Sequence, residues 1–168
     1  MQFTKKYVSL FILITIVSVF VSCASSKNTT SVLSGTDISK YKYVVFGTGV
    51  EGDAELEDIL MMVQNDISEK LQVVSAEKAK TLIAFGEKVA SPKINIKTND
   101  SHTCISIIFY DYDTDQSIAV VKSKGIGLTI SQDKKLAYKA IKKELNKVFP
   151  KNWIIRLTES LICLDGTT

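Results

Sequence analysis

The sequence predicts an α+β domain, in which a mostly antiparallel sheet of about four strands carries two amphipathic helices on one face. Two features lead to this prediction. Short runs rich in β-branched and aromatic residues are separated by polar turns, and two longer segments repeat apolar residues at helical spacing. The order strand, helix, strand, strand, strand, helix also lacks the regular alternation of a parallel α/β fold.

The first strand and the first helix are expected at 43–46 and 56–71. The run YVVF at 43–46 is β-branched and aromatic, and glycines follow it. Asp53 is the expected helix cap, and the acidic residues after it favour the positive end of the helix dipole. One apolar stripe with a period of 3.6 residues contains Leu56, Ile59, Leu60, Val63, Ile67 and Leu71.

The middle of the chain predicts three further strands. A turn of helix at 75–79 leads into a strand at 81–89, which Ser91 and Pro92 end. A polar loop at 93–102 follows, with room for a short strand at 94–96. Two long strands at 103–112 and 117–130 are close enough in the sequence to form a hairpin.

A second amphipathic helix is expected at 132–148, with Ser131 as its cap and Pro150 beyond its end. Its apolar face contains Leu136, Ala140, Ile141, Leu145 and Val148. The remaining segment, 151–168, is expected to pack on the domain. Its apolar residues at 153–164 have helical spacing, although the same composition suits a strand.

Residues 1–22 are predicted to be a lipoprotein signal peptide. Lys5 and Lys6 precede an apolar run at 7–21, which is shorter than the about 20 residues that span a membrane. The segment FVSC at 20–23 resembles the lipobox of bacterial lipoproteins, although Phe20 stands where Leu, Val or Ile is usual. Cys23 is therefore the predicted lipidation site. An ordinary secretory peptide or an uncleaved anchor helix is the alternative.

Residues 23–40 are predicted to be a flexible tether between the lipidated Cys23 and the domain at 41–150. The tether is rich in Ser and Thr and lacks aromatic residues, so it cannot bury enough apolar surface to offset the entropy of ordering it. Loss of Lys5 and Lys6 with the signal peptide leaves 19 of the 21 basic residues against 18 acidic ones. This near-neutral balance, without basic patches interleaved with aromatic residues, argues against a nucleic-acid partner.

Two stretches carry a resemblance to known proteins. VVSAEKAKTLIAF at 73–85 and IIFYDYDTDQSIAVVKSKGIG at 107–127 resemble segments of small periplasmic lipoproteins that are common in Bacteroidetes and belong to uncharacterised domain families. The likeness covers roughly 41–150. Lys80 stands where those proteins often have Asp. The resemblance implies a periplasmic location and this architecture, and it implies no catalytic site.

Gly47, Gly49 and Gly52 match the dinucleotide-binding pattern G-x-G-x-x-G between a strand and a helix. Acidic residues crowd the start of that helix, where a pyrophosphate would have to bind, and would repel it. The chain also offers a hairpin where a second βαβ unit is needed. Dinucleotide binding is therefore disfavoured, and the glycines are interpreted as a strand-to-helix loop.

Asp111, Asp113 and Asp115 have the spacing that opens a calcium loop. Gln116 replaces the glycine of the sharp turn, and Lys122 stands at the position of the bidentate Glu. The three carboxylates are better interpreted as turn residues of a hairpin, because Asp side chains bond to nearby backbone. No metal site is predicted.

His102 and Cys104 are two residues apart on a predicted strand, so their side chains share a face. A Cys and His pair can activate a thiolate, yet no acid that would orient the His is identifiable. Cys104 and Cys163 are the only cysteines besides Cys23. They could form a disulfide in the periplasm, or they could both be buried thiols.

Lysines crowd the last predicted strand and helix. They could meet an anionic partner, a lipid headgroup or a polysaccharide, although a solvated helix face also accounts for them. This set contains Lys122, Lys124, Lys134, Lys135, Lys139, Lys142 and Lys143.

The sequence as a whole favours a non-enzymatic, membrane-anchored lipoprotein of the bacterial cell envelope that acts as a binding or scaffold module. Its expected partners are the membrane, through Cys23, and an envelope protein or polymer; no cofactor is expected. An envelope hydrolase or thiol enzyme using His102 and Cys104 is the alternative. Ala24 stands where an Asp would retain some lipoproteins in the inner membrane, which favours the periplasmic side of the outer membrane.

Overall fold

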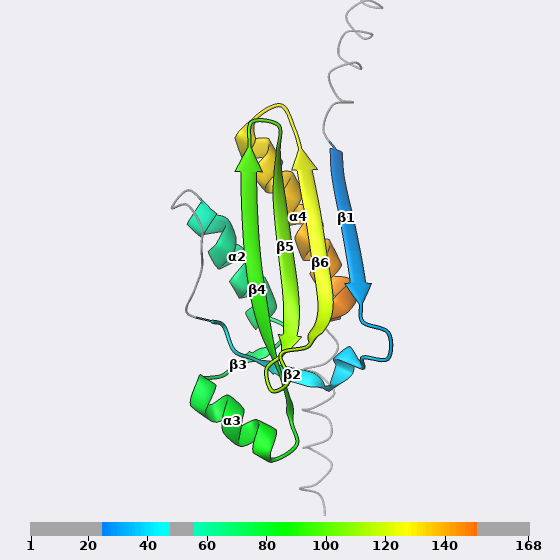
Figure 1. Cartoon of the computed structure of the whole chain (residues 1–168). Coiled ribbons are helices and arrows are strands. Elements are labelled where there is room, and N and C mark those ends of the chain that lie inside the picture. The colour runs from blue at the N-terminus through cyan, green and yellow to red at the C-terminus, as the bar shows by residue number, and fades with distance from the viewer. Residues whose placement is uncertain (1–24, 48–55, 151–168) are drawn as a thin grey trace, which may run out of the picture.

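The computed structural model describes residues 25–47 and 56–150. Within these ranges the chain forms one six-stranded sheet, three α-helices and a short 3-10 helix (Figure 1). The α+β class is confirmed, but the sheet has more strands than the four expected, and a third helix is present. The predicted signal peptide, the predicted cap Asp53 and the segment 151–168 lie outside the described residues.

The strand order across the sheet is β1-β6-β5-β4-β2-β3. The strands are β1 (Ser25–Val32), β2 (Tyr41–Val44), β3 (Gln72–Val73), β4 (Lys88–Asn99), β5 (His102–Asp111) and β6 (Ser117–Ile126). The pairs from β1 to β4 are antiparallel, whereas β2 is parallel to both β3 and β4. The sheet is therefore mixed, because helical crossovers connect β2, β3 and β4 and such crossovers make neighbouring strands parallel.

Two helices cover one face of the sheet. They are α2 (Glu57–Ser68) and α4 (Ile130–Val148), which lie behind the strands in Figure 1. The main core lies between these helices and the alternate residues of the strands, with Ile105, Ile107 and Phe109 of β5 at its centre. Both of these helices were predicted, whereas a third helix, on the opposite face, was not. The cap of α4 is Thr129 rather than Ser131, since the Thr129 side chain accepts a hydrogen bond from the Gln132 amide.

The third helix, α3 (Ala76–Ala84), packs on the opposite face of the sheet, at the end near β2 and β3 (Figure 1). The prediction of a strand at 81–89 is wrong for its first half. Ser75 caps α3 by accepting a hydrogen bond from the Lys78 amide, and Ala79, Leu82 and Ile83 have the spacing of a helix face. Gly86, two residues after the end of α3, has a φ of 83°, which suits the left-handed residue that follows many helices.

The prediction of a polar loop at 93–102 is also wrong for most of its length, because β4 continues through Pro92 to Asn99. The Val45 amide donates to Ala90 O, so the backbone groups of residues 90 and 92 face the side of β4 on which β2 lies. β2 ends before it reaches Pro92. The missing N–H of Pro92 therefore faces an edge where no described strand needs it, which is where a strand tolerates proline.

The largest difference from the sequence prediction concerns the tether. Ser25–Val32, within the segment expected to be flexible, forms β1 and pairs with β6 along its whole length. This strand is polar and mostly exposed, so apolar burial does not hold it. The backbone of β6 and the buried Glu144 of α4 hold it instead. No helix in the described part of the chain is long and apolar enough to cross a membrane.

Candidate functional site

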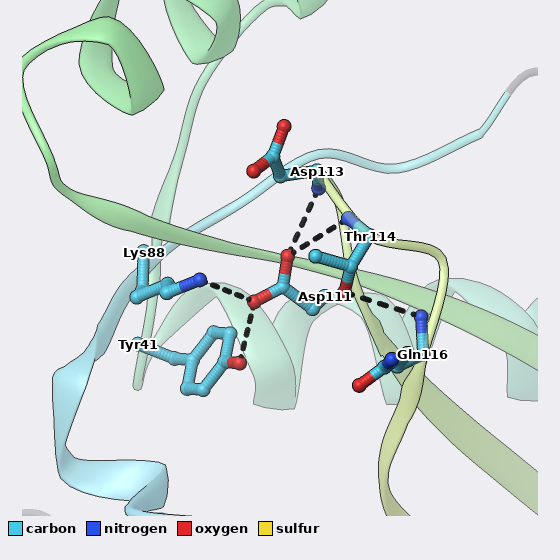
Figure 2. Close-up of polar contacts among 6 residues, drawn as sticks. All are labelled: Tyr41, Lys88, Asp111, Asp113, Thr114 and Gln116. Carbon is cyan, nitrogen blue, oxygen red and sulfur yellow. Dashed lines mark hydrogen bonds and ion pairs between the residues drawn. The ribbon is translucent and has the colours of Figure 1, made fainter.

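The Asp111 carboxylate organises the turn between β5 and β6, as Figure 2 shows. Its Oδ1 atom accepts hydrogen bonds from the backbone N–H groups of Asp113 and Thr114, at 3.0 and 3.2 Å. Its Oδ2 atom accepts from the Tyr41 hydroxyl at 2.7 Å and from the Lys88 ammonium at 3.0 Å. A buried carboxylate at the end of β5 thus binds the hairpin turn to β2 and β4.

The surroundings of Asp111 stabilise its charged form. Burial opposes ionisation, but the hydrogen bonds from Tyr41, Lys88 and the turn amides outweigh it and hold the pKa of Asp111 below its usual range. Burial, and then the hydrogen bond to Asp111, raises the pKa of the Tyr41 phenol far above its ordinary value. Each carboxylate oxygen accepts two hydrogen bonds from the protein, so this cluster has a structural role: it holds the turn and the strands together.

The three aspartates of the calcium-like pattern do not converge. Asp111 is buried, whereas Asp113 and Asp115 are exposed in the turn. Asp115 has a φ of 54°, a left-handed conformation that Asp tolerates well. In the described ranges 25–47 and 56–150, no group of three or more His, Cys, Asp or Glu side chains could hold a metal ion.

The candidate binding site is the open face of the sheet, which we define as the side of β1, β6, β5 and β4 opposite α2 and α4. Residues alternate between the two faces of a strand, so the register places the side chains of this face in rows. One row contains Lys97, Cys104, Lys124 and Lys27. The next contains Asn95, Ser106, Lys122 and Thr29, and the third contains Lys93, Ile108, Val120 and Ser31.

Five lysines lie on the open face, and in these rows no Asp or Glu accompanies them. Lys27 and Lys124 stand directly opposite each other on β1 and β6. Like charges in that position destabilise a sheet. Within the described residues none of the five forms an ion pair. The open face is therefore a basic surface whose charges are unbalanced within the described residues.

Protection of a sheet edge explains only part of this pattern. Lysines on edge strands prevent pairing with other chains, which can account for Lys93 and Lys97 on β4. Lys122 and Lys124 are different, because β6 lies between β1 and β5 in the interior of the sheet. Interior strands have no edge to protect, so these two lysines need another reason.

Sequence reasoning found part of this surface. It identified Lys122 and Lys124 but grouped them with lysines of α4, which the structure places on the other side of the sheet. The even spacings of Lys93 with Lys97 and of Lys122 with Lys124 were the available signal. Lys27 had none, because its segment was expected to be a tether.

His102 and Cys104 share a face of β5, as their spacing predicted; that face is the open one, and both side chains are partly buried. The His102 ring Nδ1 lies 2.9 Å from the Ser101 hydroxyl in the β4–β5 turn. Within the described residues no carboxylate bonds to either side chain. The possible disulfide remains a prediction, because Cys163 lies outside the described residues.

The glycine pattern is described only at Gly47, since Gly49 and Gly52 lie outside the described residues. Gly47 follows β2 and lines a pocket of about 250 Å³ at the place where β2 leaves β4, together with Phe46, Gln64, Pro92 and Tyr110. A different pair of glycines has a clear structural role. A Cβ on Gly125 would lie 2.2 Å from Asp133 O, and one on Gly127 would lie 2.7 Å from Gln132 Cβ, so α4 requires both for its approach to β6.

No protein-family model matches the sequence, and no curated protein matches it either. Among solved structures, the PelC dodecamer from Paraburkholderia phytofirmans is 11% identical, with a TM-score of 0.46 over 74% of this chain and 98% of that one. A PelC variant from the same organism is 13% identical, with a TM-score of 0.45 over 75% and 98%. TolB from Acinetobacter baumannii is 14% identical, with a TM-score of 0.34 over 73% of this chain and 31% of TolB. At these values the likeness assigns no function to the chain.

Proposed function

We propose that this protein is a non-enzymatic binding module, anchored to the bacterial cell envelope through a lipid on Cys23, which binds an anionic envelope polymer on the open face of its sheet. The observation that carries the proposal is the set of five lysines on that face, whose rows contain no Asp or Glu among the residues that the structure describes. We place the protein on the periplasmic side of the outer membrane, because Ala24 follows Cys23 where an inner-membrane retention signal would have Asp.

The spacing of the lysines suits an extended polymer. Neighbouring strands lie about 4.8 Å apart, and residues two apart on a strand are about 7 Å apart. The row with Lys97, Lys124 and Lys27 crosses four strands. On the same face, Lys122 lies in the second row and Lys93 in the third. A chain of repeated negative charges could contact several of these ammonium groups at once. Such contacts would also relieve the repulsion between Lys27 and Lys124.

The geometry gives less support to a thiol enzyme. His102 has its described polar contact with Ser101, in an exposed turn, and not with a carboxylate that would orient the ring for base catalysis. Cys104 stands in the lysine row between Lys97 and Lys124. Replacing Cys104 by Ser should therefore leave polymer binding unchanged, whereas it would abolish a thiol activity.

Hydrogen exchange during a titration tests the proposed binding face. The lipidated chain in neutral detergent is mixed with dextran sulfate, and uncharged dextran is the control. We expect slower exchange of amides in β1 and β6, with little change in α2 and α4. Protection confined to the helices would refute the open face as the site. Protection by polyglutamate but not by dextran sulfate would show that the partner is an acidic protein rather than a polymer.

Metabolic labelling tests the anchor separately. Cells that express the full chain are given a radioactive fatty acid, and the wild type is compared with Cys23→Ala. The proposal predicts a labelled band that disappears in the variant. A band of equal strength in both proteins would contradict lipidation at Cys23.

A further inference from the structure

The start of β1 fixes which end of the domain can lie against a membrane. β1 begins at Ser25, two residues after Cys23, and two extended residues span at most about 7 Å. The polar headgroup region is roughly 5–8 Å thick on each side of a bilayer. A lipid on Cys23 therefore holds the first residues of β1 at the level of the headgroups.

Three other parts of the domain lie at the same end as the start of β1. They are the turn between β4 and β5, the end of β6 and the beginning of α4, all at the top of Figure 1. We call this the proximal end. The distal end, with α3 and the β5–β6 turn, lies beyond Val32, which is about 24 Å along the strand from Ser25.

The proximal end presents two exposed apolar side chains where the chain passes from β6 into α4: Leu128 lies in the loop, and Ile130 is the first residue of α4. Leu128 is 67% exposed and Ile130 is 46% exposed. Hydrogen bonds hold this loop in place: the Leu128 amide donates to Gln132 Oε1 at 2.9 Å, and the Gly127 amide donates to the Asp133 carboxylate. The two side chains are thus displayed at the start of α4, where hydrogen bonds tie the preceding loop to the first turn of the helix.

We infer that Leu128 and Ile130 insert into the interfacial region of the lipid bilayer, so that the domain stands with its proximal end on the membrane and the open face of the sheet exposed beside it. Apolar side chains that enter this region bind to it in proportion to the apolar area they bury. The inference rests on the proposed function through the anchor at Cys23. It adds the contact surface and the orientation of the bound domain.

The position of the anchor selects this surface over another apolar group. Phe85, at the end of α3, is 82% exposed and would be the better candidate from exposure alone. It lies at the distal end, however, where Asp113 and Asp115 are also exposed in the β5–β6 turn. While β1 stays paired with β6, an upright domain holds Phe85 far from the headgroups.

Photo-crosslinking in membranes tests the orientation. A benzophenone-bearing residue replaces Leu128, Asn95 on the open face, or Phe85 in three separate full-length proteins. Isolated membranes are illuminated, and lipid adducts are measured on the corresponding peptides by mass spectrometry. We expect several-fold more lipid adduct at position 128 than at positions 95 and 85. Resistance to trypsin before illumination confirms that each variant is folded.

The outcomes separate the orientation from the anchor. Adducts that are as frequent at position 95 would mean that the domain lies with its open face on the membrane, and adducts at position 85 would mean that it is inverted; either result overturns the inference. The absence of adducts at 128 in a protein that carries a fatty acid on Cys23 would overturn it while the anchor stands. An unmodified Cys23 in the same sample would refute the anchor, and the inference with it.

Discussion

The Asp111 carboxylate accepts hydrogen bonds from two side chains and two backbone amides, and its ordinary competitor, water, is largely excluded. Sequence reasoning identified Asp111 as a hairpin residue from its place in a short, Asp-rich turn. It could not identify Tyr41 and Lys88 as partners, because they come from strands 70 and 23 residues away in the sequence. Local turn chemistry is readable from neighbouring residues, whereas partners across a sheet depend on the register.

Replacing Asp111 by Asn should destabilise the domain and change its response to acid. The variant loses the charge that Lys88 and Tyr41 share, at a cost of about 1.5–3 kcal/mol in the free energy of unfolding at neutral pH. The depressed pKa of Asp111 means that its contribution is present above about pH 4 and is lost as pH falls through the folded-state pKa. Urea unfolding at pH 7 and pH 3 should show a smaller difference between variant and wild type at the lower pH. An equal difference at both pH values would contradict this role.

Replacing Gly125 by Ala should destabilise the domain by about 1–3 kcal/mol or more, because the added methyl group meets the backbone of α4 at Asp133 and Ala137. Gly47→Ala is the matched control, since a Cβ there would meet nothing within 4 Å. Thermal unfolding of the two variants measures the difference. Equal stabilities would mean that α4 can move away from β6 without cost.

The strand β1 and the helix α3 show where prediction from the sequence reached its limit. The amphipathic helices α2 and α4 and the β5–β6 hairpin could be predicted because their apolar residues repeat at 3.6 or 2 residues. β1 could not, because its residues are polar and its order comes from the edge of β6 and from Glu144. α3 was half missed, since its short run of Thr, Leu and Ile also suits a strand.

Removal of the Glu144 charge should release β1 from α4. Glu144 is buried and accepts hydrogen bonds from Lys147, Thr30 and Asn28; these bonds, that from Lys147 first, lower its pKa. In Glu144→Gln we expect faster cleavage by trypsin after Lys27, which the paired strand protects. In the wild type, β1 should likewise detach from α4 as the pH falls through the folded-state pKa of Glu144, because a carboxyl group with a depressed pKa stabilises the fold only while it is ionised. Unchanged cleavage after Lys27 would show that pairing with β6 alone holds the strand.

For the whole molecule, the structure changes the interpretation of the segment that begins at Ser25 and of the lysines. A tether would have let the domain stand off from the membrane, but β1 begins almost at the predicted anchor. The lysines that looked like one basic region divide between the open face and α4. The position of β1 could not be read from the sequence, because the strand is polar and pairs with the distant β6. The division of the lysines could be read only in part, from the even spacing of Lys122 and Lys124 on their strand.

The central claim is that the open face binds an anionic polymer, and two matched double variants test it most directly. Lys122→Gln with Lys124→Gln removes two charges from the open face, and Lys139→Gln with Lys143→Gln removes two from the exposed side of α4. Both variants have the same net charge, so non-specific attraction falls equally in the two. The measurement is the affinity for dextran sulfate at low and at physiological salt. We predict a loss of about tenfold for the open-face variant, equivalent to about 1.4 kcal/mol, and a much smaller loss for the α4 variant. Equal losses, or a larger loss for the α4 variant, would contradict the claim.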